Sequence, residues 1–117
     1  MSPRGRHVLA DLWGCKPLEA EAIAGAAKQA AVLAGATVRE VVCHEFTPEG
    51  CSVIVVLAES HLSVHTYPEC GYVAVDVFTC GSTARPTRAV RFLRDCFKAS
   101  ACQVRHVPRG LEPKLVA

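Results

Sequence analysis

One segment in the middle of the chain gathers side chains that could do chemistry. Between Leu57 and Cys80 there is a serine directly after a carboxylate (Glu59 and Ser60), then two histidines and two tyrosines, and the thiol of Cys80 ends the segment. Short polar residues placed right after an apolar run are costly to bury unless they are used. A serine hydroxyl becomes a nucleophile when a base or a strained backbone activates it. The pattern therefore indicates a reactive site around Ser60.

The Glu59–Ser60 junction has the chemistry needed for self-cleavage. Attack of the Ser60 oxygen on the preceding carbonyl would give an ester by an N-to-O acyl shift. Removal of the Ser60 α-proton would then eliminate the upstream chain, and the dehydroalanine left behind would hydrolyse to a pyruvoyl group. His65 is a suitable base, because imidazole titrates near neutrality. It is close enough in sequence for the loop to fold it back over Ser60.

Two other interpretations of the same residues stay open at this point. An isolated Glu-Ser pair is common and is typical of a turn at the end of a strand. His61 and His65, four residues apart, would suggest a metal pair if they lay on a helix. Pro68 and the β-branched Val64 disfavour that helix, and no third ligand is evident, so we predict no metal site.

Two strings of residues carry a family resemblance. The string ESHLSVHTYPE runs from Glu59 to Glu69, and GYVAVDVFTCG runs from Gly71 to Gly81. Both resemble the self-cleavage and active-site segment of the bacterial-type S-adenosylmethionine decarboxylases, which make their own pyruvoyl cofactor from a serine. The similarity extends over nearly the whole chain.

The resemblance implies a role for several residues. It implies one domain over residues 1–117, cleaved between Glu59 and Ser60 into 1–59 and 60–117, with Ser60 becoming the pyruvoyl group that forms a Schiff base with the substrate. His65 would be the proton acceptor in processing, and Cys80 the proton donor in decarboxylation. The remaining implied residues are Ser52, which assists processing, and Phe46, Tyr67 and Glu69, which contact the substrate.

The implied function is decarboxylation of S-adenosylmethionine to CO2 and the aminopropyl donor used in spermidine and polyamine synthesis. The pyruvoyl group would act as the electron sink. One alternative keeps the pyruvoyl chemistry but decarboxylates a basic amino acid, arginine or ornithine. Another is a non-catalytic dimeric binding module, which would leave the chain intact. The resemblance also implies a homodimer with its sites at the subunit interface.

Composition excludes several other classes of protein. With 117 residues, half of them apolar, and a net charge of +2, the chain is typical of a single globular domain. We expect no nucleic-acid partner, and we expect the arginines at 85, 88, 91 and 94 to form a solvated helix face. No apolar run approaches the roughly 20 residues of a membrane span, and there is no signal peptide, so we expect a cytoplasmic protein. Seven cysteines without a C-x-x-C pair favour free thiols over disulfides or structural zinc.

The hydrophobic patterns predict a β-α-β-β-β-α-β order. Strands are expected at 7–13, 37–46, 52–58, 72–79 and 102–107, with a tail after Pro108, and 59–70 without regular structure. One helix should run from Pro17 to a stop at Gly35 with an apolar face of Leu18, Ile23, Ala26, Ala27, Ala30 and Leu33. The second should start at Pro86 and turn Val90, Leu93 and Phe97 inward. We predict an α+β two-layer sandwich, a mostly antiparallel sheet with two helices on one face. Its other, apolar face would form a dimer.

Overall fold

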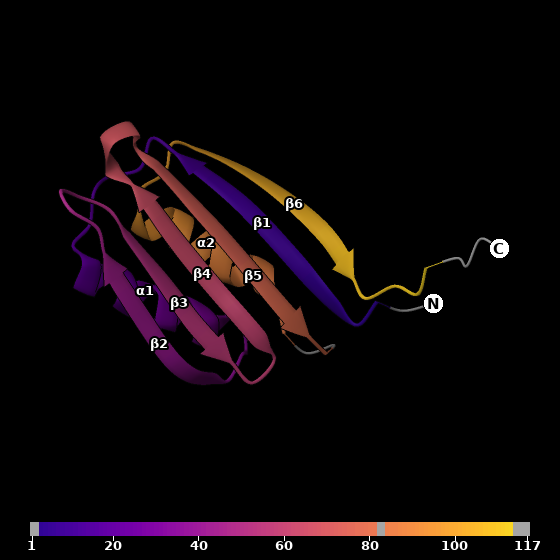
Figure 1. Ribbon diagram of the computed structural model, residues 1–117. Helices are drawn as coiled ribbons and strands as arrows, with labels where there is room; N and C mark the ends of the chain where they lie inside the picture. Colours follow the sequence, from indigo (N-terminus) through magenta and orange to yellow (C-terminus); the bar gives the residue numbers. More distant parts are fainter. Residues whose placement is uncertain (1–2, 82–83, 114–117) are drawn as a thin grey trace.

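A single antiparallel sheet, backed by two helices, organises the chain. The computed structural model describes residues 3–81 and 84–113. Its strands are β1 (Gly5–Trp13), β2 (Val38–Glu45), β3 (Cys51–Leu57), β4 (Ser60–Tyr67), β5 (Tyr72–Cys80) and β6 (Ala101–Arg109). They lie in the order β2-β3-β4-β5-β1-β6, and each neighbouring pair is antiparallel. Both helices lie behind the sheet in Figure 1, which confirms the predicted α+β class and its two layers.

Strand β4 is the main correction to the sequence prediction. Residues 59–70 were expected to lack regular structure, but Ser60–Tyr67 is a strand between β3 and β5, followed by the short 3-10 helix η1 (Pro68–Cys70). Leu62 and Val64 are fully buried against the helices, whereas His61 and His65 face the other side. The strand was missed because its outward residues are polar, although the alternation of strand side chains was present in the sequence.

The first helix starts later than predicted, and its buried face matches the predicted one in part. Helix α1 is Ala20–Leu33. Gly35 follows it with a φ of 80°, the left-handed conformation expected of a glycine that ends a helix. The buried stripe is Ile23, Ala27, Ala30 and Ala31. Leu18 precedes the helix and Leu33 is exposed, so including these two residues in the apolar face was wrong. Small alanines let this helix pack closely on the sheet.

The second helix agrees with the sequence pattern. Helix α2 is Pro86–Cys96, with proline in its first turn. Val90, Leu93 and Phe97 are buried as predicted. The arginines at 85, 88, 91 and 94 are all exposed, which confirms a solvated face. Strand β6 continues through Pro108 to Arg109, so the chain leaves the sheet later than expected.

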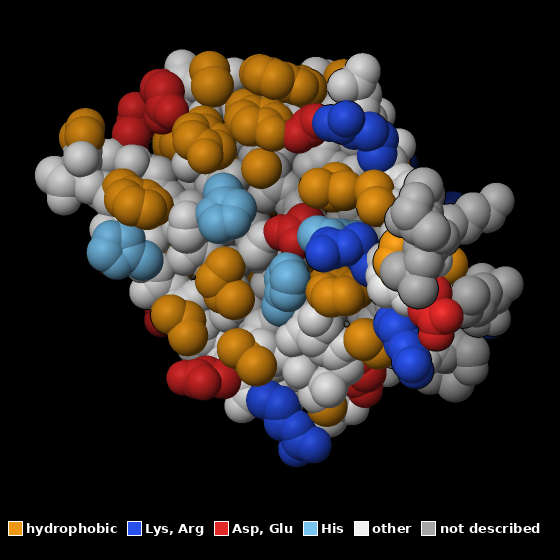
Figure 2. Space-filling model, turned by 45° about the vertical axis from the view of Figure 1, so that its right-hand side comes forward, with side chains coloured by type: hydrophobic (Ala, Val, Ile, Leu, Met, Phe, Trp, Pro, Cys, Tyr) orange, Lys and Arg blue, Asp and Glu red, His pale blue; other side chains and the backbone are white. Residues whose placement is uncertain are grey.

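The two helices cover one face of the sheet and leave the other face open. One face packs on the helices and holds the core, in which Leu12, Val53, Val55 and Leu62 are completely buried. The other face, turned to the viewer in Figure 1, has no layer over it among the residues that the structure describes. Figure 2 shows apolar side chains spread across this open face around a group of histidines. Its exposed large apolar residues include Leu9, Trp13, Val42, Val56, Tyr67 and Val107.

Neither helix qualifies as a membrane span. Among the residues that the structure describes, no helix combines the length and the hydropathy that crossing a bilayer requires. All seven cysteines are free thiols, as predicted.

Candidate active site

Ser60 occupies a strained position at the start of β4. The strand follows a tight turn of Ala58 and Glu59, and Leu57 and Ser60 face each other across it. The φ angle of Ser60 is 154°, in a region that residues with a side chain rarely adopt. Such conformations cost about 1–3 kcal/mol and persist only where surrounding structure imposes them. Here the paired strands β3 and β5 impose it on the residue expected to react.

The carbonyl of the Glu59–Ser60 peptide already accepts a hydrogen bond. The backbone N–H of Cys80 donates to the Glu59 oxygen over 3.1 Å. A donor at this place polarises the carbonyl and would stabilise negative charge on its oxygen if the Ser60 hydroxyl attacked the carbon. Cys80 thus contacts the junction through its backbone N–H, and its thiol is free and exposed.

The Glu59 side chain fixes the turn before Ser60. Its carboxylate accepts hydrogen bonds from the Thr37 backbone N–H (2.9 Å) and hydroxyl (3.2 Å). The Thr37 N–H is the main reason that the pKa of Glu59 is lowered, because it stabilises the ionised carboxylate. The chain entering β2 therefore holds the residue upstream of the predicted cleavage junction.

Ser52 and His65 form a second group, on the open face. Ser52 on β3 lies directly opposite His65 on β4. The Ser52 hydroxyl oxygen and His65 Nδ1 are 2.7 Å apart. This contact orients the imidazole, so that Nε2 is left to act on another group. The predicted processing assistant and the predicted base are therefore direct neighbours.

A small cleft surrounds this pair and contains all the predicted substrate contacts. Its volume is about 250 Å³, and it is lined by Phe46, Glu49, Ser52, His65, Thr66, Tyr67 and Glu69. The Tyr67 ring stacks on Tyr72 at 5.4 Å between centroids. The hydrogen bond that Tyr72 donates to Asp11, together with burial, raises the pKa of Tyr72 to about 12. Aromatic faces and a carboxylate suit a ligand with a cation and a flat ring.

The two groups lie at opposite ends of β4. His65 is five residues beyond Ser60, which corresponds to about 17 Å along an extended strand. The expectation that a loop folds His65 back over Ser60 is wrong for this chain, because residues 60–67 form one continuous strand. The structure brings Glu59, Ser60 and Cys80 together, and separately Ser52, His65, Phe46, Tyr67 and Glu69.

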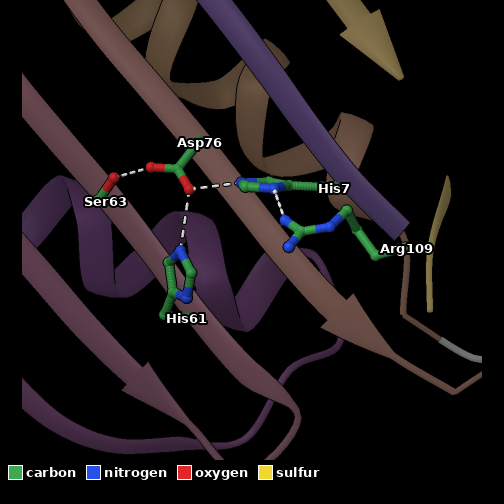
Figure 3. A network of polar contacts seen from close by, with 5 residues as sticks. All are labelled: His7, His61, Ser63, Asp76 and Arg109. Carbon is green, nitrogen blue, oxygen red and sulfur yellow. Dashed lines mark hydrogen bonds and ion pairs between the residues drawn. The ribbon is translucent and has the colours of Figure 1, made fainter. Parts of the chain in front are cut away.

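A polar network lies between these groups on the open face (Figure 3). Asp76 accepts hydrogen bonds from His7 Nε2 (2.7 Å), His61 Nε2 (2.9 Å) and the Ser63 hydroxyl. Arg109 donates to His7 Nδ1 over 3.0 Å, so the proton of a neutral His7 faces Asp76. Asp76 thereby has three donors, which accounts for a carboxylate in the middle of a sheet.

This network is also the one candidate metal cluster among the described residues. His7, His61 and Asp76 each place a ligand atom within 4.8 Å of the others. Their ligand atoms are already used in hydrogen bonds, and Arg109 occupies the remaining nitrogen of His7. His61 and His65 would have formed a metal pair only on a helix, and they lie four positions apart on the strand β4.

Several of these residues were not found from the sequence. Alternation along β5 put Asp76 on the face of Phe78 and Cys80, but nothing in the sequence paired it with His7, 69 residues away. The same holds for Thr37 and Glu59, and for the Cys80 N–H and the Glu59 carbonyl. These contacts depend on strand order and register.

Comparison with known proteins decides the family. The family model described as S-adenosylmethionine decarboxylase matches residues 6–110. The chain belongs to the S-adenosylmethionine decarboxylase family. The resemblance seen in the two sequence strings is thereby confirmed.

Relatives and a solved structure agree over the full length of the chain. It is 46% identical over 116 residues to an S-adenosylmethionine decarboxylase proenzyme from Oceanobacillus iheyensis, covering 97% of this chain and 92% of that protein. A Moorella thermoacetica proenzyme of the same name is 45% identical over 121 residues, covering 100% and 97%. The crystal structure of the adenosylmethionine decarboxylase from Aquifex aeolicus VF5 has a TM-score of 0.88 at 30% identity, covering 100% of this chain and 99% of that one. For this family member, both the predicted family and the predicted fold class are confirmed.

Proposed function

We propose that this chain decarboxylates S-adenosylmethionine with a pyruvoyl group that it makes from its own Ser60. The observation that carries the proposal is the state of the Glu59–Ser60 peptide. Its serine has a φ of 154°, and its carbonyl accepts a hydrogen bond from the Cys80 N–H. Both features favour attack by the serine hydroxyl, and both occur in a member of the S-adenosylmethionine decarboxylase family.

The residues at the junction fit the formation of this group. The Ser60 oxygen attacks the Glu59 carbonyl carbon, the C–N bond breaks, and the hydroxyl proton is transferred to the Ser60 nitrogen. A base then removes the Ser60 α-proton, which releases residues 1–59 with a free carboxylate. Loss of ammonia by hydrolysis completes the group at the start of 60–117. The pyruvoyl group supplies an electron sink for the carboxylate electrons of a bound α-amino acid.

The base in this scheme comes from a second copy of the chain. His65 is about 17 Å from Ser60 along β4 in its own chain. A two-fold axis parallel to the open face and perpendicular to β4, passing over the middle of that strand, would lay each chain's Ser52–His65 pair over the other chain's Ser60–Cys80 end. Such an isologous contact builds two equal sites. It also covers an open face rich in apolar residues, among them Leu9, Val56 and Phe78.

The cleft beside His65 supplies the substrate contacts. Phe46 and Tyr67 offer ring faces to a sulfonium cation and an adenine, and Glu69 offers a carboxylate to ribose hydroxyls. In the dimer, each cleft lies next to the partner's cleavage end. Each complete site would then take its cleft from one chain and its Ser60 and Cys80 from the other.

Cys80 acts after processing. Its thiol is exposed at the end of β5, beside the junction. A thiol of moderate acidity suits the donation of a proton to the substrate carbon once CO2 has left. The same residue would then support processing through its backbone N–H and turnover through its side chain.

Intact mass spectrometry under denaturing conditions tests the proposal. The wild-type protein should give two species that together account for residues 1–59 and 60–117, the second lacking a free amino terminus. Ser60→Ala should give one full-length species with the same fold. CO2 release should then follow S-adenosylmethionine but not arginine or ornithine. A single full-length wild-type mass after long incubation would contradict the proposal.

A further inference from the structure

Thr79 carries a buried hydroxyl without a partner. Its side chain is 1% exposed, and its Oγ1 has no hydrogen-bond partner within the part of the chain that the structure describes. It is the one buried side-chain polar atom in that state among the described residues. A hydroxyl left unsatisfied in a protein interior costs free energy, and valine would fill the same volume without that cost. The hydroxyl therefore calls for an explanation other than packing.

The sheet register places this hydroxyl opposite the reacting serine. Thr79 on β5 and Ser60 on β4 are direct cross-strand partners. The hydrogen bond from the Cys80 N–H to the Glu59 carbonyl joins the residue after Thr79 to the residue before Ser60. In an antiparallel ladder this bond flanks a non-hydrogen-bonded pair, the type in which side chains stand closest, with Cα atoms about 4.5 Å apart. Side chains of such a pair leave the sheet on the same side.

We propose that Thr79 is a positioning residue for the acyl shift at Ser60. Its hydroxyl is reached by the Ser60 Oγ when that side chain turns towards the Glu59 carbonyl. It accepts the hydrogen bond of the Ser60 hydroxyl and keeps a lone pair of that oxygen directed at the carbonyl carbon. In the step itself, the Ser60 Oγ–carbon bond forms and the carbon–nitrogen bond breaks. The hydroxyl proton passes to the Ser60 nitrogen, and Thr79 is unchanged.

One backbone group and one side-chain group of β5 then act on the same peptide bond. The Cys80 N–H polarises the carbonyl oxygen, over 3.1 Å, and the Thr79 hydroxyl directs the nucleophile from the neighbouring position. Because adjacent strand residues alternate in direction, the Thr79 side chain lies on the helix-covered side while the Cys80 thiol lies on the open side. This division leaves the thiol free for turnover and keeps the Thr79 hydroxyl away from water.

The test compares Thr79→Val with Thr79→Ser, and it rests on the proposed self-cleavage at Ser60. Cleavage of freshly translated chain is followed by gel and intact mass. Thr79→Val should cleave at least about tenfold more slowly, because a misplaced nucleophile loses much of its reactivity. Thr79→Ser, which keeps the hydroxyl, should cleave close to the wild-type rate. The Tm of uncleaved Thr79→Val, measured in the Ser60→Ala background, should be no lower than that of Ser60→Ala alone.

Hydroxylamine, which cleaves esters, shows whether Thr79→Val slows the formation of the ester. In a His65→Ala background, where elimination is slow, the ester should accumulate and hydroxylamine should release residues 1–59. Adding Thr79→Val should reduce that release about tenfold, and Thr79→Ser should restore it. Wild-type rates of cleavage in Thr79→Val, or a slow Thr79→Ser, would overturn the role of the hydroxyl while leaving the proposed function intact. A wild-type chain that never cleaves would instead overturn the proposed function.

Discussion

The two ends of strand β4 differ in how they hold the candidate catalytic residues. At the Ser60 end the backbone is strained and the polar contacts are made by backbone groups: the Cys80 N–H on the Glu59 carbonyl and the Thr37 N–H on the Glu59 carboxylate. At the His65 end the backbone is regular, and side chains make the contacts, with Ser52 on His65 and a cleft around them. In the proposed function, the first end would supply the electrophile and the nucleophile, and the second the base and the binding site.

Under the proposed function, this difference explains why one chain would be insufficient. A strand is stiff, and the 17 Å or so between its ends cannot be closed by a local movement. Placing the base far from the serine leaves an isolated chain without the elimination step, so that processing would follow assembly. The open face between the two ends, with its apolar residues and the Asp76 network, is the surface that would bring them together.

Mixed dimers test most directly whether the two ends of β4 act together across two chains. Ser60→Ala and His65→Ala should each fail to complete processing alone, with a loss of at least about a hundredfold for His65→Ala. When the two chains are co-expressed, the intact Ser60 of the His65→Ala chain should be cleaved, because the partner subunit's His65 reaches it. Tags of different mass on the two chains identify which one is cut. No cleavage in verified mixed dimers would mean that each chain must supply both residues.

Cys80→Ala separates the two roles assigned to the Ser60 end. The variant keeps the backbone N–H on the Glu59 carbonyl, so self-cleavage should proceed close to the wild-type rate. Turnover should fall by about a hundredfold or more, because the proton donor is absent. Intact mass measures the first step and CO2 release the second. Equal losses in both steps would show that the thiol acts in processing as well.

Asp76→Asn tests the region between the two ends. The amide has one acceptor oxygen, so it cannot accept all three hydrogen bonds, and its N–H2 group must face either the protons of the two histidines or the Ser63 hydroxyl. We expect a loss of about 1–3 kcal/mol in the free energy of unfolding. Dimerisation should weaken, while the Ser52–His65 contact is unaffected. Denaturant unfolding and sedimentation velocity measure the two effects, with His106→Ala on the opposite face of the sheet as the control.

Glu59→Gln gives the smallest expected effect. The Thr37 N–H lowers the pKa of Glu59 because it stabilises the ionised form. The carboxylate therefore contributes stability that is fully present above its unfolded pKa and is lost as the pH falls through its lower folded pKa. The glutamine variant should cleave a few-fold more slowly at neutral pH, since its hold on Thr37 is weaker. Its cleavage rate should also lack the decline that the wild type shows in acid from this group.

The helices and strands were predicted correctly where the hydrophobic pattern agrees with residues that start or stop an element, such as proline and glycine. Helix α2 and its stripe of Val90, Leu93 and Phe97 follow from a 3.6-residue period after a proline, and Gly35 ends α1 as expected. Strand β4 was missed because polar residues on an open sheet face conceal the alternation of Leu62 and Val64. A sequence does not reveal in advance which face of a sheet will lack cover.

The sequence by itself determined the family and the fold class, and it supplied the candidate reactive residues, because these candidates depend on residue types in a continuous string from Glu59 to Gly81. Only the tertiary structure decided their grouping. Ser52 joins His65, and Cys80 joins Glu59, through strand register, and Asp76 meets His7 through the order of β5 and β1. Contacts between strands depend on which residues stand opposite one another, and spacing along the chain carries no record of that pairing.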